Sequence, residues 1–289
     1  MAERFVEVRA QDGLSLTGME MRPGKAAGAC LVWVPGFGVG YDLPQCARLG
    51  RELARRGIAF VSAGLRGQHG GVTGWRYRDH RVELARVGGW WEIFEESAWD
   101  VAAWVEHAVA LGHRQVVLAG HSFGALRAVF YLARCVDPRV AALVTVSLSF
   151  GLRALDPETA RLAARLVAEG RGEQLLPEGS WPHGFGTTTV SAQTYASWWR
   201  VAPGFFGPGG EHFAGITCPL LVLYGSADVG GQEEIGLVIR LARAAPRAEG
   251  HVLEGVGHGY VGGEATIAEA IAAWIATLAL DEEGDRART

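Results

Sequence analysis

Short, largely apolar runs alternate with amphipathic stretches along most of this chain. The apolar runs fall at residues 29–34, 58–62, 115–119, 140–146, 219–224 and 251–253. The stretches between them, such as 44–56, 94–111, 123–134 and 233–244, repeat apolar residues at helical spacing. A short run that is apolar throughout is typical of a strand buried on both faces. Strands of this kind alternating with helices predict an open, mostly parallel α/β sheet.

The two ends of the chain carry further signals. Residues 5–8 and 14–21 alternate in polarity around Asp12-Gly13, which predicts an N-terminal hairpin. Near the other end, Ile267, Ile271 and Trp274 recur at helical spacing within residues 267–280. That stretch is too short for a membrane span and is interrupted by a glutamate, so it predicts a C-terminal helix docked on the core.

Two segments interrupt the alternation of strands and helices. Residues 70–93 are rich in Gly, Arg and Trp, and residues 148–216 separate two predicted strands by far more than an ordinary loop. The longer segment contains a helix signal at Asp156-Pro157 and a second one at 192–201. We therefore expect a core formed by residues 1–147 and 217–289, with residues 148–216 inserted above it as a lid.

Composition narrows the class of protein. The chain has 289 residues, of which 49% are hydrophobic and 20% charged, and its formal net charge is −4. This balance excludes a largely disordered chain and offers no overall field to attract nucleic acid or an anionic membrane. The four cysteines are scattered, and the first ten residues lack the apolar run of a signal peptide, so we expect reduced thiols and a cytoplasmic protein. The oligomeric state is left open between monomer and homodimer.

Cofactor motifs are missing from the sequence. The glycines at 36–40 follow a predicted strand but lack the pattern and the downstream acid of a dinucleotide site. No cluster of Cys and His has the spacing of a metal site. We therefore expect chemistry that needs neither a cofactor nor a metal.

The strongest chemical signal is Gly120-His121-Ser122-Phe123-Gly124. It lies between a predicted strand and a predicted helix, where a tight turn holds the serine hydroxyl out at the carboxyl end of the sheet. A serine alcohol is a weak nucleophile near neutral pH and needs a base. Without such a base the motif would be only a glycine-rich turn.

Of the nine histidines, His258 is the best candidate for the base, because it follows the last predicted strand and has a glycine on each side. His107 is expected to be exposed on its helix. The base needs a carboxylate to orient it. Asp228 ends another strand and is the first choice for that acid, with Glu233 and Glu234 as alternatives.

The order Ser122, Asp228, His258, together with residues 35–38, 66–70, 225–228 and 257–258, resembles the α/β-hydrolase superfamily of serine hydrolases. The resemblance implies an eight-stranded, mostly parallel sheet with a helical lid after strand six. It implies that Ser122 is the nucleophile, His258 the base and Asp228 the acid. It also implies an oxyanion hole formed by the backbone N–H groups of Phe123 and Phe37. Residues 70–94 are similar to a group of small esterases that includes siderophore-ester hydrolases.

The implied activity is cleavage of a carboxylic ester of a small, apolar or aromatic substrate through an acyl-enzyme. Lactone, amide or thioester hydrolysis, carbon–carbon cleavage, acyl transfer and a non-catalytic receptor remain alternatives on the same fold. Aromatic residues of the predicted lid either line the pocket or pack the lid on its base. The candidates for lining the pocket are His121, Trp181, Tyr195, Trp198, Trp199 and Phe206.

Overall fold

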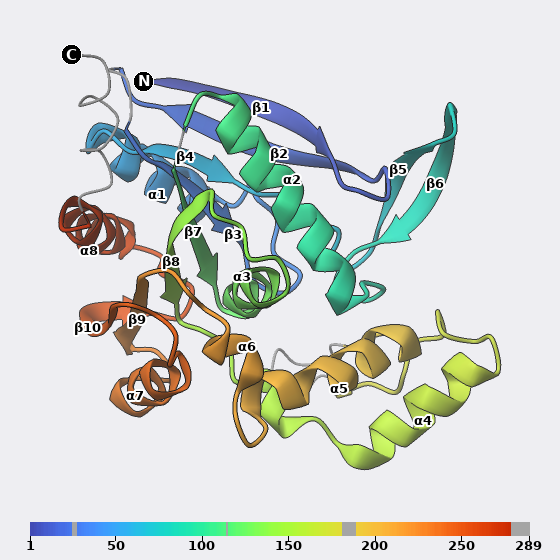
Figure 1. The fold of residues 1–289 in the computed structure, drawn as a ribbon. Coiled ribbons are helices and arrows are strands. Elements are labelled where there is room, and N and C mark those ends of the chain that lie inside the picture. Colours follow the sequence, from blue (N-terminus) through green and yellow to red (C-terminus); the bar gives the residue numbers. More distant parts are fainter. Residues whose placement is uncertain (25–27, 114, 181–188, 279–289) are drawn as a thin grey trace.

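The computed structural model describes residues 1–24, 28–113, 115–180 and 189–278. An eight-stranded sheet forms its centre, in the order β1-β2-β4-β3-β7-β8-β9-β10 (Figure 1). β2 pairs antiparallel with β1 and β4, and every other neighbouring pair is parallel. The strands are β1 (Ala2–Arg9), β2 (Ser15–Arg22), β3 (Cys30–Val34), β4 (Ala59–Ser62), β7 (Val116–His121), β8 (Val140–Val146), β9 (Leu220–Ala227) and β10 (Ala248–Gly257). The predicted fold class and the N-terminal hairpin are thus confirmed.

The central strands explain why the sequence shows continuous apolar runs. Every residue of β3 is buried. Cys30, Val32 and Val34 pack into the core on one face of the sheet, and Leu31 and Trp33 pack into the core on the other. Because neither face meets water, both sets of alternating positions carry apolar side chains.

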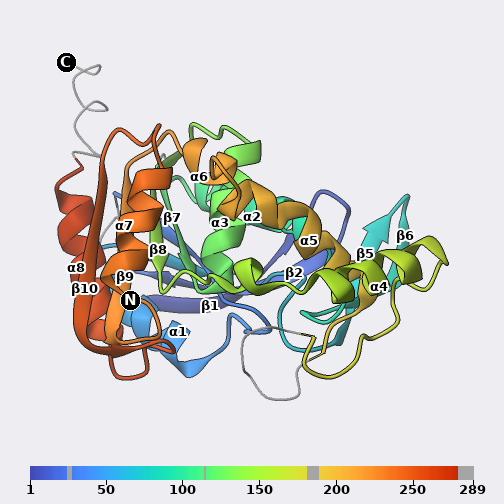
Figure 2. The same cartoon turned by 90° about the horizontal axis from the view of Figure 1, so that it is seen from below.

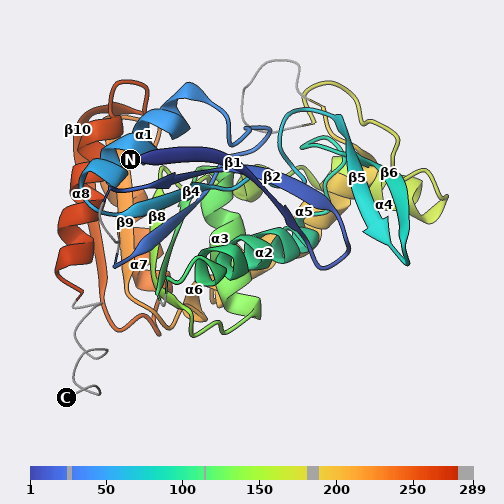
Figure 3. The same ribbon diagram turned by 90° about the horizontal axis from the view of Figure 1, so that it is seen from above.

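Helices cover both faces of the sheet (Figure 3). α1 (Pro44–Arg55) and α8 (Glu264–Ala276) pack on one face, and α2 (Ser97–Ala110), α3 (Phe123–Arg134) and α7 (Gln232–Leu241) pack on the other. Ile267, Ile271 and Trp274 of α8 are buried, as expected for a docked helix. No helix in the described part of the chain has both the length and the apolar character to span a membrane.

Residues 70–93 contain a structure that the hydrophobic pattern did not indicate. β5 (Val72–Arg78) and β6 (Arg81–Val87) form a separate two-stranded sheet that projects from the core (Figure 1). Most of their residues are exposed or half-buried, so the strands lack the apolar runs that mark the main sheet. A 3₁₀ turn, η1 (Phe94–Glu96), then leads into α2.

The segment between β8 and β9 carries several helices in its described residues. It contains η2 (Gly151–Ala154), α4 (Pro157–Ala168), α5 (Ala192–Phe206) and α6 (Glu211–Ala214). The predicted cap of α4 is present, because the Asp156 carboxylate accepts a hydrogen bond from the Thr159 N–H at 2.7 Å. α4, α5 and the β5–β6 hairpin lie at the same end of the molecule (Figure 2), and Arg86 of that hairpin forms an ion pair at 3.0 Å with Glu173, in the chain that follows α4.

Hydrogen bonds connect α5 to the chain just before α2. The Trp90 carbonyl accepts from the Ser191 N–H at 2.7 Å and from the Thr194 hydroxyl at 3.0 Å. The Phe94 N–H donates to the Ser197 hydroxyl at 3.1 Å. The start of α5 is thereby fixed to the segment that leads into the core.

One side-chain expectation was wrong. His107 of α2 is not exposed: only 16% of its side chain meets solvent, and its Nε2 lies 3.2 Å from Glu20 Oε2. Glu20 is itself buried and also accepts hydrogen bonds from Arg4. The helix pattern placed His107 on a polar face, but it could not indicate that the N-terminal hairpin covers that face.

Candidate active site

Ser122 lies at the turn between β7 and α3, at the carboxyl edge of the sheet. Its backbone has φ 54° and ψ −121°, a conformation that a non-glycine residue adopts only where its surroundings hold it. Those surroundings include two backbone hydrogen bonds, from the Ser122 N–H to the Val146 carbonyl at 2.9 Å and from the Ser149 N–H to the Ser122 carbonyl at 3.2 Å. The turn therefore fixes the serine against the end of β8.

The glycines on either side of Ser122 are required by close packing. A Cβ on Gly120 would lie 2.5 Å from the Ala125 Cα, and a Cβ on Gly124 would lie 2.2 Å from the Val34 carbonyl oxygen. Both contacts are far below van der Waals distance and involve backbone that cannot move aside cheaply. Small residues at these two positions let strand, turn and helix approach each other around Ser122.

The structure brings Ser122, His258 and Asp228 together from three strand ends. Ser122 follows β7, Asp228 follows β9 and His258 follows β10. His258 Nε2 lies 3.0 Å from Ser122 Oγ, and His258 Nδ1 lies 2.9 Å from Asp228 Oδ1. The Asp228 side chain is inaccessible to solvent, whereas 32% of the His258 side chain is exposed. The ring is therefore oriented from a buried side and open toward a prospective substrate.

The Asp228 carboxyl is held in its ionised form. Burial alone would raise its pKa, but hydrogen bonding to His258 and to Ser147 outweighs burial and lowers the pKa below its ordinary value. The Val229 N–H also donates to Asp228 Oδ1, at 2.6 Å. A carboxylate that stays charged favours the tautomer of His258 with its proton on Nδ1 and its lone pair toward Ser122.

The alternative acids lie elsewhere. Glu234 Oε2 accepts a hydrogen bond from the Gly231 N–H at 2.7 Å and so caps α7. Glu233 is exposed in the first turn of the same helix. The geometry favours Asp228 as the partner of His258. Ser147, the first residue after β8, also hydrogen-bonds to Asp228.

His121 lies beside the candidate triad of Ser122, His258 and Asp228, and it is buried and stacked on Trp33 with an interplanar angle of 9°. Its Nε2 is 2.7 Å from the His258 carbonyl oxygen, to which it donates a hydrogen bond. Burial lowers the pKa of His121 to about 4, and the nearby His258 ring acts in the same direction. His121 is therefore neutral near pH 7, and its contacts support the loop of His258 rather than line a pocket.

The loop after β3 lies directly against the serine. A Cβ on Gly36 would be only 3.3 Å from Ser122 Cβ. The Phe37 ring contacts the rings of Phe123 and Trp198, with centroids 5.8 and 5.4 Å away. Phe123 is the first residue of α3, and the N-terminus of a helix favours negative charge. The two residues predicted to supply the oxyanion donors thus flank Ser122.

The aromatic residues predicted for the pocket differ in their exposure to solvent. Tyr195 and Trp198 are almost fully buried, and the Tyr195 hydroxyl accepts a hydrogen bond from the Asp156 N–H at 2.6 Å. Phe206 is half-buried, Trp199 is exposed, and Trp181 lies outside the described residues. Tyr195 and Trp198 therefore pack inside the protein, and among the described aromatic candidates Phe206 and Trp199 retain the most accessible surface.

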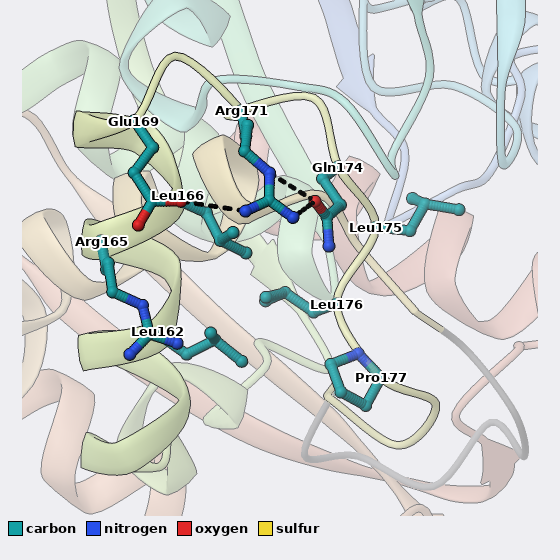
Figure 4. Close-up of a pocket in the computed structure, with 9 residues that line it drawn as sticks. All are labelled: Leu162, Arg165, Leu166, Glu169, Arg171, Gln174, Leu175, Leu176 and Pro177. Carbon is teal, nitrogen blue, oxygen red and sulfur yellow. Dashed lines mark hydrogen bonds and ion pairs between the residues drawn. The ribbon is translucent and has the colours of Figure 1, made fainter.

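A hollow of about 660 Å³ lies away from the triad, between α4 and the chain that follows it (Figure 4). The Arg171 side chain projects beside it and bonds to Glu169 and Gln174. None of its lining residues belongs to the triad. In the described ranges, no group of three or more His, Cys, Asp or Glu side chains is placed to hold a metal ion.

Sequence reasoning missed one polar feature next to the site. Arg127 of α3 and Glu92 form an ion pair in which both side chains are almost inaccessible to solvent. Arg127 lies four residues after Phe123 and is the one charged residue in the apolar stretch 123–133. A charged residue in an otherwise apolar helix was the available signal.

Comparisons with known proteins agree with this architecture. Solved structures with the same fold include the alpha/beta hydrolase GrgF from Penicillium sp. sh18, with a TM-score of 0.70 and 19% identity over 96% of this chain and 98% of that one. A highly thermostable carboxyl esterase from Bacillus coagulans has a TM-score of 0.70 and 13% identity over 96% and 99%. Est1E from Butyrivibrio proteoclasticus with bound ferulic acid has a TM-score of 0.65 and 17% identity over 94% and 99%.

No curated protein sequence matches this chain significantly. The alpha/beta hydrolase family, in contrast, matches residues 31–272, which is most of the chain. The match includes Ser122, Asp228 and His258 and the strands that precede them. This protein therefore belongs to the alpha/beta hydrolase family.

Proposed function

We propose that this protein is a serine hydrolase that cleaves a carboxylic ester of a small apolar or aromatic substrate. The observation that carries the proposal is the chain of contacts from Ser122 Oγ to His258 Nε2 at 3.0 Å and from His258 Nδ1 to Asp228 Oδ1 at 2.9 Å. A serine, a histidine and an aspartate at these distances supply a nucleophile, its base and the group that orients the base.

In the proposed mechanism Ser122 Oγ attacks the ester carbonyl carbon while His258 Nε2 takes the serine proton. The Phe123 and Phe37 N–H groups stabilise the tetrahedral oxyanion. The intermediate collapses as His258 returns the proton to the leaving alcohol, which leaves an acyl group on Ser122. Water, deprotonated by His258, then attacks the acyl-enzyme and releases the acid.

Three aromatic side chains support an apolar or aromatic substrate. Phe150 follows Ser149, whose N–H bonds to the Ser122 carbonyl, and its ring lies 5.1 Å from the Phe206 ring. Phe37, Phe150 and Phe206 are all half-buried and keep some accessible apolar surface, and Phe37 and Phe150 directly follow residues that contact Ser122. We assign residues 148–216 the role of a lid because Phe150 and Phe206 both come from this segment. Ferulic acid, which is bound to Est1E, a protein of the same fold, is a small aromatic acid.

The first experiment measures intact mass after exposure to a fluorophosphonate, for wild type and Ser122→Ala. Ser149→Ala is the matched control. The Ser149 N–H bonds to the Ser122 carbonyl, but the histidine base His258 bonds to the Ser122 hydroxyl and not to that of Ser149 among the described contacts. We expect the wild type and the control to gain one probe mass and Ser122→Ala to gain none. Turnover of p-nitrophenyl esters of increasing acyl length, and of aromatic acids, then maps the pocket.

Labelling that persists in Ser122→Ala would remove the serine from its proposed role. A wild type that neither labels nor turns over any ester would favour a receptor on the same fold. Addition of a competing alcohol distinguishes hydrolysis from acyl transfer, because a transferase would release the new ester in place of the acid.

We place the activity in the cytoplasm, on the expectation that the four cysteines are reduced thiols.

A further inference from the structure

A buried ion pair lies beside residues 35–37, the loop that carries the proposed oxyanion donor Phe37, and has no part in the candidate triad. Arg127 NH2 is 2.7 Å from Glu92 Oε1 and 2.5 Å from Oε2. The exposed fraction of the two side chains is 1% and 0%. Removing two charges from water costs free energy that their attraction offsets only in part. Complete burial accordingly raises the pKa of Glu92 even though Arg127 opposes that effect. Stability alone is a weak reason for such a pair.

The second guanidinium nitrogen of Arg127 contacts the backbone next to the serine. Its NH1 donates to the carbonyl oxygens of Pro35 and Gly36, each at 3.4 Å. The Gly36 carbonyl and the Phe37 N–H belong to one peptide unit, which is planar, and in the trans form they point in opposite directions. Whatever fixes the Gly36 carbonyl therefore also fixes the direction of the Phe37 N–H.

Other contacts hold the guanidinium in place. Its central carbon lies 5.0 Å from the centroid of the Phe123 ring. Arg127 therefore contacts Phe123 through its ring, and Phe37 through the peptide unit that Phe37 shares with Gly36. A Cβ on Gly67 would lie 1.9 Å from Glu92 Oε2, which shows how closely the backbone encloses the carboxylate. The Arg127 guanidinium is thus contacted on several sides, and its side chain is held in one rotamer.

We propose that Arg127, oriented by Glu92, is a positioning residue that fixes the Gly36–Phe37 peptide plane so that the Phe37 N–H points at the oxyanion. The proposal rests on the function proposed above. Donors that are already aligned when charge develops need no reorganisation during the reaction, and this is the main source of their effect. The cation on the Gly36 carbonyl also polarises the same peptide and strengthens its N–H as a donor.

The test uses a double variant, Glu92→Gln/Arg127→Met, which removes both charges together and leaves no unpaired ion in the core. Oxyanion donors act mainly on the transition state, so we expect kcat for a p-nitrophenyl ester to fall by about 10- to 100-fold with KM almost unchanged. Binding of a trifluoromethyl ketone, whose adduct with serine carries an oxyanion, is expected to weaken by a similar factor. Arg127→Lys, which keeps the charge, is expected to recover part of kcat.

A matched control separates positioning from general loss of stability. Arg66 and Asp100 form another buried ion pair, with NH2 2.8 Å from Oδ1, and they have no contact with the Pro35–Phe37 loop among those described. Arg66→Met/Asp100→Asn is expected to lower the melting temperature but to leave kcat per active site unchanged. Titration with the fluorophosphonate counts the folded sites in every sample.

The outcomes distinguish the two proposals. A wild type without labelling or turnover overturns the proposed function and the positioning role with it. An active wild type, combined with a double variant whose kcat per titrated site stays within about twofold, overturns the positioning role alone. A rise in KM at constant kcat, or an equal loss of kcat in the Arg66→Met/Asp100→Asn control, overturns it as well.

Discussion

His121 makes the stability of the folded protein sensitive to acid. Its pKa is about 4 in the folded protein, mainly because the ring is buried, against 6.5 for the ordinary side chain. Between these values the unfolded chain binds a proton that the folded chain excludes, so stability is complete above about pH 6.5 and falls as the pH drops. From about pH 7.5 to pH 5, this single ring lowers the free energy of unfolding by about 2 kcal/mol.

The perturbation is His121→Gln, because a glutamine amide can still donate to the His258 carbonyl but does not titrate. Urea unfolding, followed by tryptophan fluorescence at the two pH values, gives the free energies. We expect the wild type to lose about 2 kcal/mol more than His121→Gln on acidification. The control is His251→Gln, which removes an exposed histidine of β10 and is expected to keep the wild-type acid sensitivity.

The reasoning would be refuted by a His121→Gln protein that loses as much free energy on acidification as the wild type. That result would mean that the acid sensitivity comes from other groups. A folded-state pKa of His121 near 6.5, measured by NMR titration of the ring, would refute it independently.

Three further changes probe the site and the inserted segment. Asp228→Asn is expected to lower kcat by about four orders of magnitude, since the amide favours the wrong tautomer of His258, whereas Glu234→Gln affects α7 and leaves initial rates near wild type; the reverse result would reassign the acid. Gly124→Ala is expected to destabilise the fold by about 3 kcal/mol in urea unfolding, because the new Cβ would lie 2.2 Å from the Val34 carbonyl oxygen, and an unchanged midpoint would contradict this packing. Asp156→Ala is expected to speed amide exchange in the first turn of α4, where the Thr159 N–H loses its acceptor, and unaltered exchange would argue against the cap.

The central sheet could be predicted from the sequence because its strands are buried on both faces and so appear as unbroken apolar runs. The β5–β6 hairpin could not, since most of its residues are exposed and the alternation of charged and apolar side chains in Arg81–Val87 breaks at Leu84-Ala85. Helix ends followed local rules: Asp156 and Pro157 gave the start of α4 correctly. The solvent exposure of His107 depended on a distant hairpin and was therefore missed.

The candidate triad was predictable because each member directly follows a strand, and parallel strands bring their carboxyl ends to one edge. Arg127 and Glu92, which we propose position the Phe37 N–H, gave no such signal. Arg127 stands on a helix face and Glu92 stands in an irregular segment, and only the fold reveals that they meet. The burial of Tyr195 and Trp198 could not be predicted for a related reason, since composition records that aromatic residues are present but not which way they face.

The hydrogen bonds between Trp90 and the start of α5 bear on how this protein can be recombined with its relatives. The Trp90 carbonyl bonds to Ser191 and Thr194, and the Phe94 N–H bonds to the Ser197 hydroxyl. A chimera that exchanged only residues 148–216 would bring in foreign partners for these groups, and a buried group left without one costs about 1–3 kcal/mol. The two stretches are about a hundred residues apart in sequence but depend on each other for these hydrogen bonds. A grafted 148–216 segment should therefore be transferred together with residues 88–94.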